Sequence, residues 1–99
     1  MIVEIAQLKL VKGTDPKAFV RATEATHPFL QKQPGYVDRE LLKLTDDQWV
    51  DLVHWKTLDE AKAAGKALMR DPSCRDFVKM LDPQGTKVLY HELVEVWKP

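Results

Sequence analysis

The chain has 99 residues, of which 44% are hydrophobic, and its 15 basic and 15 acidic side chains leave no net charge. This length suits one domain over residues 1–99, with roughly 60–70% of the unfolded surface buried on folding. The charges are balanced and dispersed, which excludes nucleic acid and a membrane surface as expected partners. One cysteine, Cys74, excludes an internal disulfide. The N-terminal apolar run is short and interrupted by Glu4 and Lys9, so we expect no signal peptide, no membrane span and a cytoplasmic location.

The first two predicted elements are a strand and a helix. Residues 2–11 alternate apolar and polar side chains and are rich in Ile, Val and Leu, which is typical of a strand. Asp15 can cap a helix that begins with Pro16, and an apolar face at three-to-four spacing follows. Pro28 lies inside this pattern, and we expect it to kink the helix or to end its regular part near Thr26.

A hairpin and a second helix follow. A Pro-Gly turn at 34–35 leads into strands predicted at 36–44 and 48–55. The charged residues of the first of these strands, Arg39 among them, predict a solvated edge strand. Residues 57–60 form a capping box, in which a Thr hydroxyl and a Glu carboxylate can each accept from an orphan backbone N–H.

The rest of the chain completes a known layout. The second helix is predicted to turn Leu68, Met69 and its small residues toward the sheet. A second cap-plus-proline signal at 71–72 predicts a short helix, and a last strand is predicted over 87–96. The order β-α-β-β-α-β predicts an α+β, ferredoxin-like fold, in which a four-stranded antiparallel sheet carries both helices on one face.

Both faces of the predicted sheet are apolar. In strand 48–55 one set of alternate residues is Trp49, Asp51, Val53 and Trp55, and the other includes Val50, Leu52 and His54. Helices can cover only one of these faces, and an uncovered apolar face is unfavourable in water. We therefore expect a homodimer joined sheet to sheet, with ~1,200–2,000 Å² or more of buried surface.

Two short motifs carry a resemblance to a known family. The Pro-Gly-Tyr turn at 34–36 and the Trp-Lys-Thr segment at 55–57, within the βαββαβ order, resemble the antibiotic-biosynthesis-monooxygenase-like proteins of the dimeric α/β-barrel superfamily. That resemblance implies a pocket between sheet and helices and, in the oxygenase branch, a reaction without metal or flavin. There the enzyme removes a proton from a phenolic substrate, the carbanion passes an electron to O₂, and the radical pair recombines. Such chemistry needs an apolar pocket that excludes water.

The resemblance also suggests site residues. Trp55 matches the family's pocket tryptophan, and Asp51 stands where the anthrone enzymes carry an asparagine. The position of the family's tyrosine is occupied by Ala61. No histidine lies between Trp55 and Leu89, where the haem-degrading branch carries one, so haem degradation is disfavoured. Neither a cofactor nor a metal is expected.

Other candidate residues come from the predicted elements. His27 follows Glu24 by three residues and could act as a base oriented by that carboxylate, or the two could form a solvated helix contact. Tyr36 could close the pocket mouth or be an ordinary strand aromatic. The remaining substrate-contacting residues we expect are Phe19, Val53 and Leu68. Trp55 itself could be a pocket wall or simply core.

The leading hypothesis is a cofactor-independent monooxygenase acting on a small aromatic or polyketide-like phenol, quinol or anthrone. Trp55 would form the pocket wall, with Asp51 or His27 moving protons. The alternative is a non-catalytic dimeric protein that holds a small hydrophobic ligand in the same pocket. A third possibility is an isomerase or decarboxylase, which would need a base but no oxygen.

Overall fold

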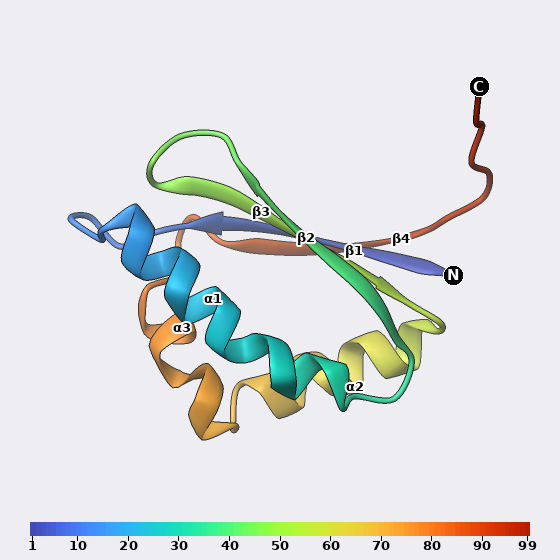
Figure 1. Ribbon diagram of the computed structural model, residues 1–99, viewed down its shortest axis with the longest axis horizontal. Helices are drawn as coiled ribbons and strands as arrows, with labels where there is room; N and C mark the ends of the chain where they lie inside the picture. Colours follow the sequence, from blue (N-terminus) through green and yellow to red (C-terminus); the bar gives the residue numbers. More distant parts are fainter.

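The computed structural model describes residues 1–99 and has two layers, a four-stranded antiparallel sheet and a layer of helices against one of its faces (Figure 1). The elements in chain order are β1 (Ile2–Lys9), α1 (Pro16–Gln31), β2 (Tyr36–Lys43), β3 (Gln48–Trp55), α2 (Leu58–Leu68), the 3₁₀ turn η1 (Pro72–Cys74), α3 (Arg75–Lys79) and β4 (Lys87–Glu92). The strand order is β2-β3-β1-β4, with β1 and β3 in the centre and every pairing antiparallel. The predicted ferredoxin-like fold is confirmed. No helix is long and apolar enough to span a membrane.

The helix starts follow from their caps. The Asp15 carboxylate accepts from the backbone N–H of Lys17, and the Thr57 hydroxyl oxygen accepts from that of Glu60. The Glu60 carboxylate accepts from the Thr57 hydroxyl at 2.9 Å, so the two side chains of the capping box bond each other. At the turn before β2, Gly35 has φ of +83°, and a Cβ there would collide with the Glu60 side chain.

The predicted helix end near Thr26 is wrong, because α1 continues through Pro28 to Gln31. Proline removes one intrahelical bond, the one to the carbonyl of Glu24, four residues earlier. Both Pro28 and Glu24 are exposed, so water can satisfy that carbonyl. The apolar side of the helix continues past the proline to Leu30, which is buried.

The last strand is shorter than predicted and ends at Glu92 rather than at residue 96. Glu92 lies opposite Ile2, and Leu93 makes the final bond, to the carbonyl of Met1, so β1 offers no further partner. The chain then leaves the body of the molecule as an extended tail, in which Trp97 is exposed (Figure 1). The inward position predicted for Met69 is also wrong: α2 ends one residue before it, and its side chain is exposed.

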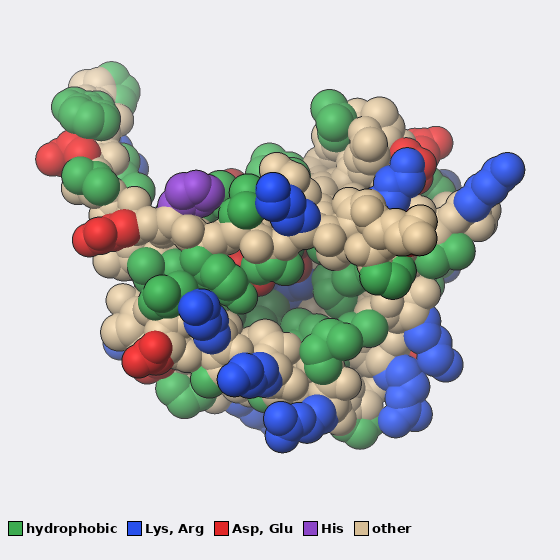
Figure 2. Space-filling model, turned by 180° about the vertical axis from the view of Figure 1, so that it is seen from behind, with side chains coloured by type: hydrophobic (Ala, Val, Ile, Leu, Met, Phe, Trp, Pro, Cys, Tyr) green, Lys and Arg blue, Asp and Glu red, His purple; other side chains and the backbone are tan.

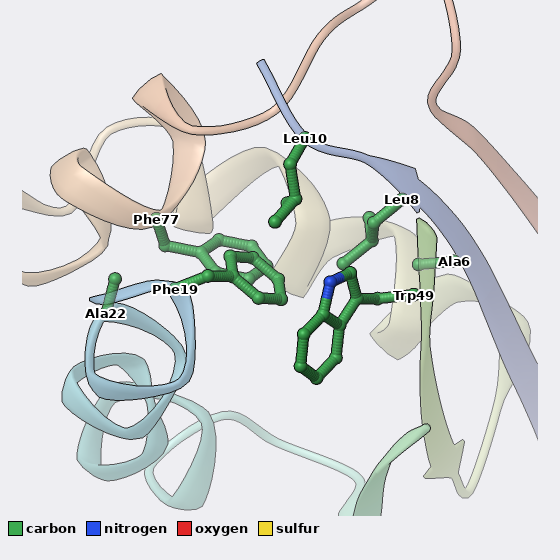
Figure 3. Close-up of a cluster of buried hydrophobic side chains, with 7 residues drawn as sticks. All are labelled: Ala6, Leu8, Leu10, Phe19, Ala22, Trp49 and Phe77. Atoms are coloured by element: carbon green, nitrogen blue, oxygen red, sulfur yellow. The ribbon is translucent and has the colours of Figure 1, made fainter. Parts of the chain in front are cut away.

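Two clusters of buried side chains fill the space between sheet and helices. The first, here called the aromatic core, consists of Ala6, Leu8, Leu10, Phe19, Ala22, Trp49 and Phe77 (Figure 3). In it the Phe19 ring lies 5.1 Å from the Trp49 ring and 5.7 Å from the Phe77 ring, centroid to centroid. The second, the small-residue core, consists of Leu30, Val53, Trp55, Ala61 and Ala64.

Candidate functional site

A carboxylate and an indole meet beside the small-residue core. Alternation along β1 places Glu4 on the same side as the buried Ala6 and Leu8, so its side chain points toward the helices. Register places Glu4 opposite Val53, two residues before Trp55 in β3. The Trp55 Nε1–H donates to Glu4 Oε1 at 2.9 Å. A diagonal contact between two central strands therefore brings together residues 51 positions apart in the chain.

Burial changes the acidity of this carboxyl. The pKa of Glu4 is raised from 4.5 to about 7, chiefly because burial disfavours the charged form. The Trp55 hydrogen bond lowers the pKa, the Asp51 charge raises it, and the Arg39 charge lowers it. Glu4 thus exists in both protonation states near neutral pH.

A buried ion pair lies next to it. The Arg39 guanidinium donates to both carboxylate oxygens of Asp51, from Nε at 2.9 Å and from Nη2 at 2.7 Å. The Arg39 and Asp51 side chains are 7% and 8% exposed. Arg39 Nη1 also donates to the Thr26 hydroxyl at 2.8 Å, which itself donates to the carbonyl of Thr23. The bidentate geometry and these further bonds fix the guanidinium in place.

Glu4, Asp51 and Trp55 border a small cavity between the sheet and α2. It is lined by Glu4, Leu30, Asp51, Val53, Trp55, Ala64, Gly65 and Leu68, and its volume is about 30 Å³. That is enough for about one or two water molecules. Figure 2 shows a hollow between the sheet layer and the helical layer, with acidic and basic atoms deep inside an apolar rim.

A wider cleft opens at the other edge of the sheet, between α1 and β2. Its volume is about 240 Å³, and it is lined by Val20, Thr23, Glu24, His27, Arg39 and Leu41. Arg39 borders this cleft while its partner Asp51 borders the cavity, so the ion pair separates the two spaces. Beside the cleft, the Tyr36 ring stands 6.1 Å from the His27 ring and 5.8 Å from the Trp55 ring. Burial raises the pKa of the Tyr36 hydroxyl.

Most of the predicted site residues come together here. Asp51, Val53, Trp55 and Leu68 line the cavity. His27 lines the neighbouring cleft, and Tyr36 joins His27 to Trp55 through ring contacts. Phe19 borders neither space, because it points into the aromatic core and is 0% exposed (Figure 3).

Two residues of the site were missed by sequence reasoning. Glu4 counted only as an interruption of an apolar run, although its parity with Ala6 and Leu8 already places it on the helix side. The predicted edge strand is confirmed, because β2 ends the strand order and most of its residues are exposed. The solvent exposure expected of Arg39 is wrong, since its guanidinium is buried against Thr26 of α1. A buried arginine needs a carboxylate partner, and Asp51 is that partner.

The residues of the cavity do not fit a haem. A haem iron needs an axial ligand such as histidine, cysteine, methionine or tyrosine, and none of these residue types lines the cavity. The histidine nearest in sequence to Trp55 is His54, which lies on the opposite face of the sheet and contacts Asp38 at 2.6 Å.

Comparison with known proteins supports the fold. No family model and no curated protein matches the chain. Among solved structures, the cofactor-independent oxygenase SnoaB from Streptomyces nogalater superposes with a TM-score of 0.74 at 16% identity, over 96% of this chain and 94% of that one. A Nitrosomonas europaea protein, provisionally assigned as an antibiotic biosynthesis monooxygenase, gives 0.73 at 20% identity over 96% and 100%.

A third structure, a point mutant of MhuD with two manganese protoporphyrin IX molecules bound per active site, gives a TM-score of 0.72 at 16% identity over the full length of both chains. Identities this low establish architecture, and the site must be argued from its own residues. This chain has the fold of the antibiotic-biosynthesis-monooxygenase-like proteins.

Proposed function

We propose that the protein is a homodimeric, cofactor-independent monooxygenase that acts on a small phenol, quinol or anthrone between the sheet and the helices. The observation that carries this proposal is a buried polar set in an otherwise apolar cavity wall: Glu4, Trp55 and Asp51 line the cavity, and Asp51 is paired with the buried Arg39. Protein interiors seldom keep such groups without a structural or chemical role, and carboxyls with displaced pKa values are concentrated at functional sites.

The reaction suits these surroundings. For an anthrone-type substrate the balance is R₂CH₂ + O₂ → R₂C=O + H₂O: a C–H proton leaves, the carbanion gives one electron to O₂, and the radicals combine before water is lost. Apolar walls exclude water from the carbanion, and Trp55 supplies a flat surface for the ring. Because Arg39 neutralises Asp51, that wall presents an ion pair rather than a bare anion to the enolate.

The cavity must enlarge to admit an aromatic ring, since about 30 Å³ holds only about one or two water molecules. Its outer wall is α2, which contributes Ala64, Gly65 and Leu68. Because small side chains bury little apolar surface, they hold a helix weakly against a sheet. We therefore propose that α2 moves outward when the substrate binds. His27 and Tyr36 lie outside this cavity, on the α1–β2 side of the Arg39–Asp51 pair.

A second copy of the chain covers the helix-free face in this proposal. Alternation places Val3, Ile5, Val50, Leu52 and Leu89 on that face, where each is half-buried in the single chain. Such a continuous apolar strip is typical of a protein–protein interface. Light scattering at micromolar concentration should give twice the chain mass, and a monomer would contradict this part of the proposal.

The test of the activity is oxygen uptake by purified, metal-free protein with a panel of anthrones, quinols and catechols. We expect saturable uptake that falls at least ~10-fold in Trp55→Phe, because the ring surface and the bond to Glu4 are lost. Trp49→Phe is the matched control, since it makes the same chemical change in the aromatic core. Equal turnover in the two variants would contradict the role of Trp55. Absence of uptake with every substrate, together with saturable quenching of Trp55 fluorescence, would instead identify a ligand-binding protein.

A further inference from the structure

We propose that Glu4 is the catalytic base of this site, the group that takes the proton from the phenolic or enolic substrate beside Trp55. The inference rests on the proposed function, because it names the proton acceptor for the substrate class given there. It replaces Asp51 and His27 in that role.

Geometry separates Glu4 from the other acid of the cavity. Asp51 has both oxygens bonded to the Arg39 guanidinium, so its lone pairs are largely occupied and its charge is balanced. Glu4 makes no ion pair, and its only side-chain partner is the Trp55 N–H on Oε1. Its second oxygen, Oε2, is therefore free to accept a proton. Of the two carboxylates on the wall, Glu4 is the one available to a ligand.

His27 is placed less well for this step. It lines the cleft on the far side of the Arg39–Asp51 pair and does not border the cavity. Tyr36 stands between His27 and Trp55, in ring contact with both. A base must reach the proton it removes, and the Arg39–Asp51 pair lies between His27 and the cavity.

The surroundings of Glu4 set its acidity for this task. The charged or titratable groups that face it are Asp51 on β3, Arg39 on β2 and Tyr90 on β4, while α2 presents only Ala64, Gly65 and Leu68. Burial among these groups raises the pKa of Glu4 to about 7. A base is most effective when its pKa lies near the working pH, because it is then both ionised and strongly basic.

The proton balance is simple. The ionised Glu4 carboxylate takes the substrate proton on Oε2 and becomes a neutral acid, while the substrate keeps the electron pair as phenolate or carbanion. After oxygen has added, the carboxylic acid returns this proton to the outer oxygen of the peroxide anion. The regenerated carboxylate then takes the second C–H proton, whose electron pair forms the C=O bond as the O–O bond breaks, and it passes that proton to the departing hydroxide, so that water leaves. The carboxylate is regenerated, and no further reactant is needed. The Trp55 N–H keeps Oε1 in place throughout.

The decisive variant is Glu4→Gln, whose amide oxygen can still accept from the Trp55 N–H but whose side chain cannot take a proton. We expect kcat to fall by roughly 10²- to 10⁴-fold, a much larger change than the rise in KM, which should not exceed about tenfold. The wild-type profile of kcat/KM against pH should show an acid limb near the Glu4 pKa, and this limb should be absent from the variant. Glu92→Gln is the matched control, since Glu92 lies two residues beyond Tyr90 on the same side of β4 but is exposed.

A second measurement does not require turnover. Phenol itself serves as the probe, and its affinity is measured by calorimetry roughly one and a half pH units below and above the Glu4 pKa. Because the ionised carboxylate is the stronger acceptor, we expect roughly tenfold tighter binding at the higher pH for wild type and no pH dependence in Glu4→Gln. The Trp55 indole N–H signal in ¹⁵N spectra, assigned through Trp55→Phe, should remain shifted in the Gln variant if the bond persists.

The outcomes separate the two proposals. Suppose that the wild type turns over substrate and that Glu4→Gln changes this turnover by less than threefold, with the same pH profile. This result would overturn Glu4 as the base and keep the monooxygenase. If phenol affinity followed the ionisation of Glu4 but no substrate gave oxygen uptake, Glu4 would remain the proton acceptor and the monooxygenase proposal would be overturned. Phenol affinity independent of pH, or absence of phenol binding, would overturn the assignment of Glu4.

Discussion

The two buried tryptophans of β3 face the same helical layer but satisfy their indole N–H groups in different ways. Trp49 donates to the backbone carbonyl of Asp46, three residues earlier, at 2.9 Å. Trp55 donates to the carboxylate of Glu4 across the sheet, at the same distance. A backbone carbonyl has no chemistry beyond its hydrogen bond, whereas a carboxylate can take a proton. The comparison favours a core role for Trp49 and supports the proposal that Trp55 belongs to a site.

The two cores that contain these tryptophans also differ in the size of their side chains and in their polar contacts. The aromatic core is filled by large rings, and the polar contact of its tryptophan is local in sequence. The small-residue core holds one large ring, that of Trp55, with Leu30, Val53, Ala61 and Ala64 around it, and it borders the cavity with its carboxylates. Large apolar side chains contribute most of the stabilisation that burial provides. We therefore expect mutations in the first region to act on stability and mutations in the second to act on activity.

The largest expected effect sharpens this contrast within the aromatic core. Phe19→Ala removes a fully buried ring that contacts Trp49 and Phe77, and it should lower the free energy of unfolding by roughly 3–5 kcal/mol. Denaturant unfolding followed by circular dichroism measures this. Under conditions where the variant stays folded, kcat should be close to wild type. A selective loss of activity without a stability change would place Phe19 in the site after all.

Arg39 connects the two regions, since its guanidinium pairs with Asp51 and also lies 5.9 Å from the centre of the Phe77 ring. Arg39→Met leaves the Asp51 carboxylate buried without a partner, which should cost about 3–5 kcal/mol of unfolding free energy. The double variant Arg39→Met with Asp51→Leu should recover most of this loss, because no unpaired charge remains. A double variant as unstable as the single one would show that packing against Phe77, rather than the ion pair, is what matters.

Glu4 makes stability depend on pH in the second region. Its pKa is raised from 4.5 in the unfolded chain to about 7 in the folded one, so the folded state holds the proton more tightly between these values. This contribution is fully present below about 4.5 and is lost as the pH rises through about 7, by up to roughly 3 kcal/mol in total. Glu4→Gln should remove it, and the variant should be more stable than wild type in mildly alkaline buffer. Parallel pH curves of melting temperature for the two proteins would contradict the raised pKa.

The sequence predicts the pattern of strands and helices well because its signals are local. Alternation in β3 places Asp51 and Trp55 on one side, and this follows from a period of two without knowledge of any partner strand. The bond between Glu4 and Trp55 depends on the register of β1 against β3, which no local pattern specifies. Burial of Arg39 likewise depends on α1 covering an edge strand, where charge alone predicts exposure.

The smallest effect that we predict separates stability from ligand binding within α2. Gly65→Ala should raise the free energy of unfolding by roughly 0.5–1 kcal/mol, because alanine loses less backbone entropy in a helix interior. The added Cβ would have the Tyr90 hydroxyl at 3.8 Å as its nearest neighbour, an ordinary contact without strain. Since Gly65 also lines the cavity, the same methyl group should weaken binding of phenol.

The control is Ala63→Gly, which makes the reverse change at an exposed position of the same helix. It should lower stability by a similar amount and leave phenol affinity unchanged. Calorimetric titration and thermal melting of the three proteins measure both quantities. If affinity followed stability across the set, the helix would act only as scaffold. If affinity fell in Gly65→Ala alone, this wall of the cavity would be the surface that the ligand contacts.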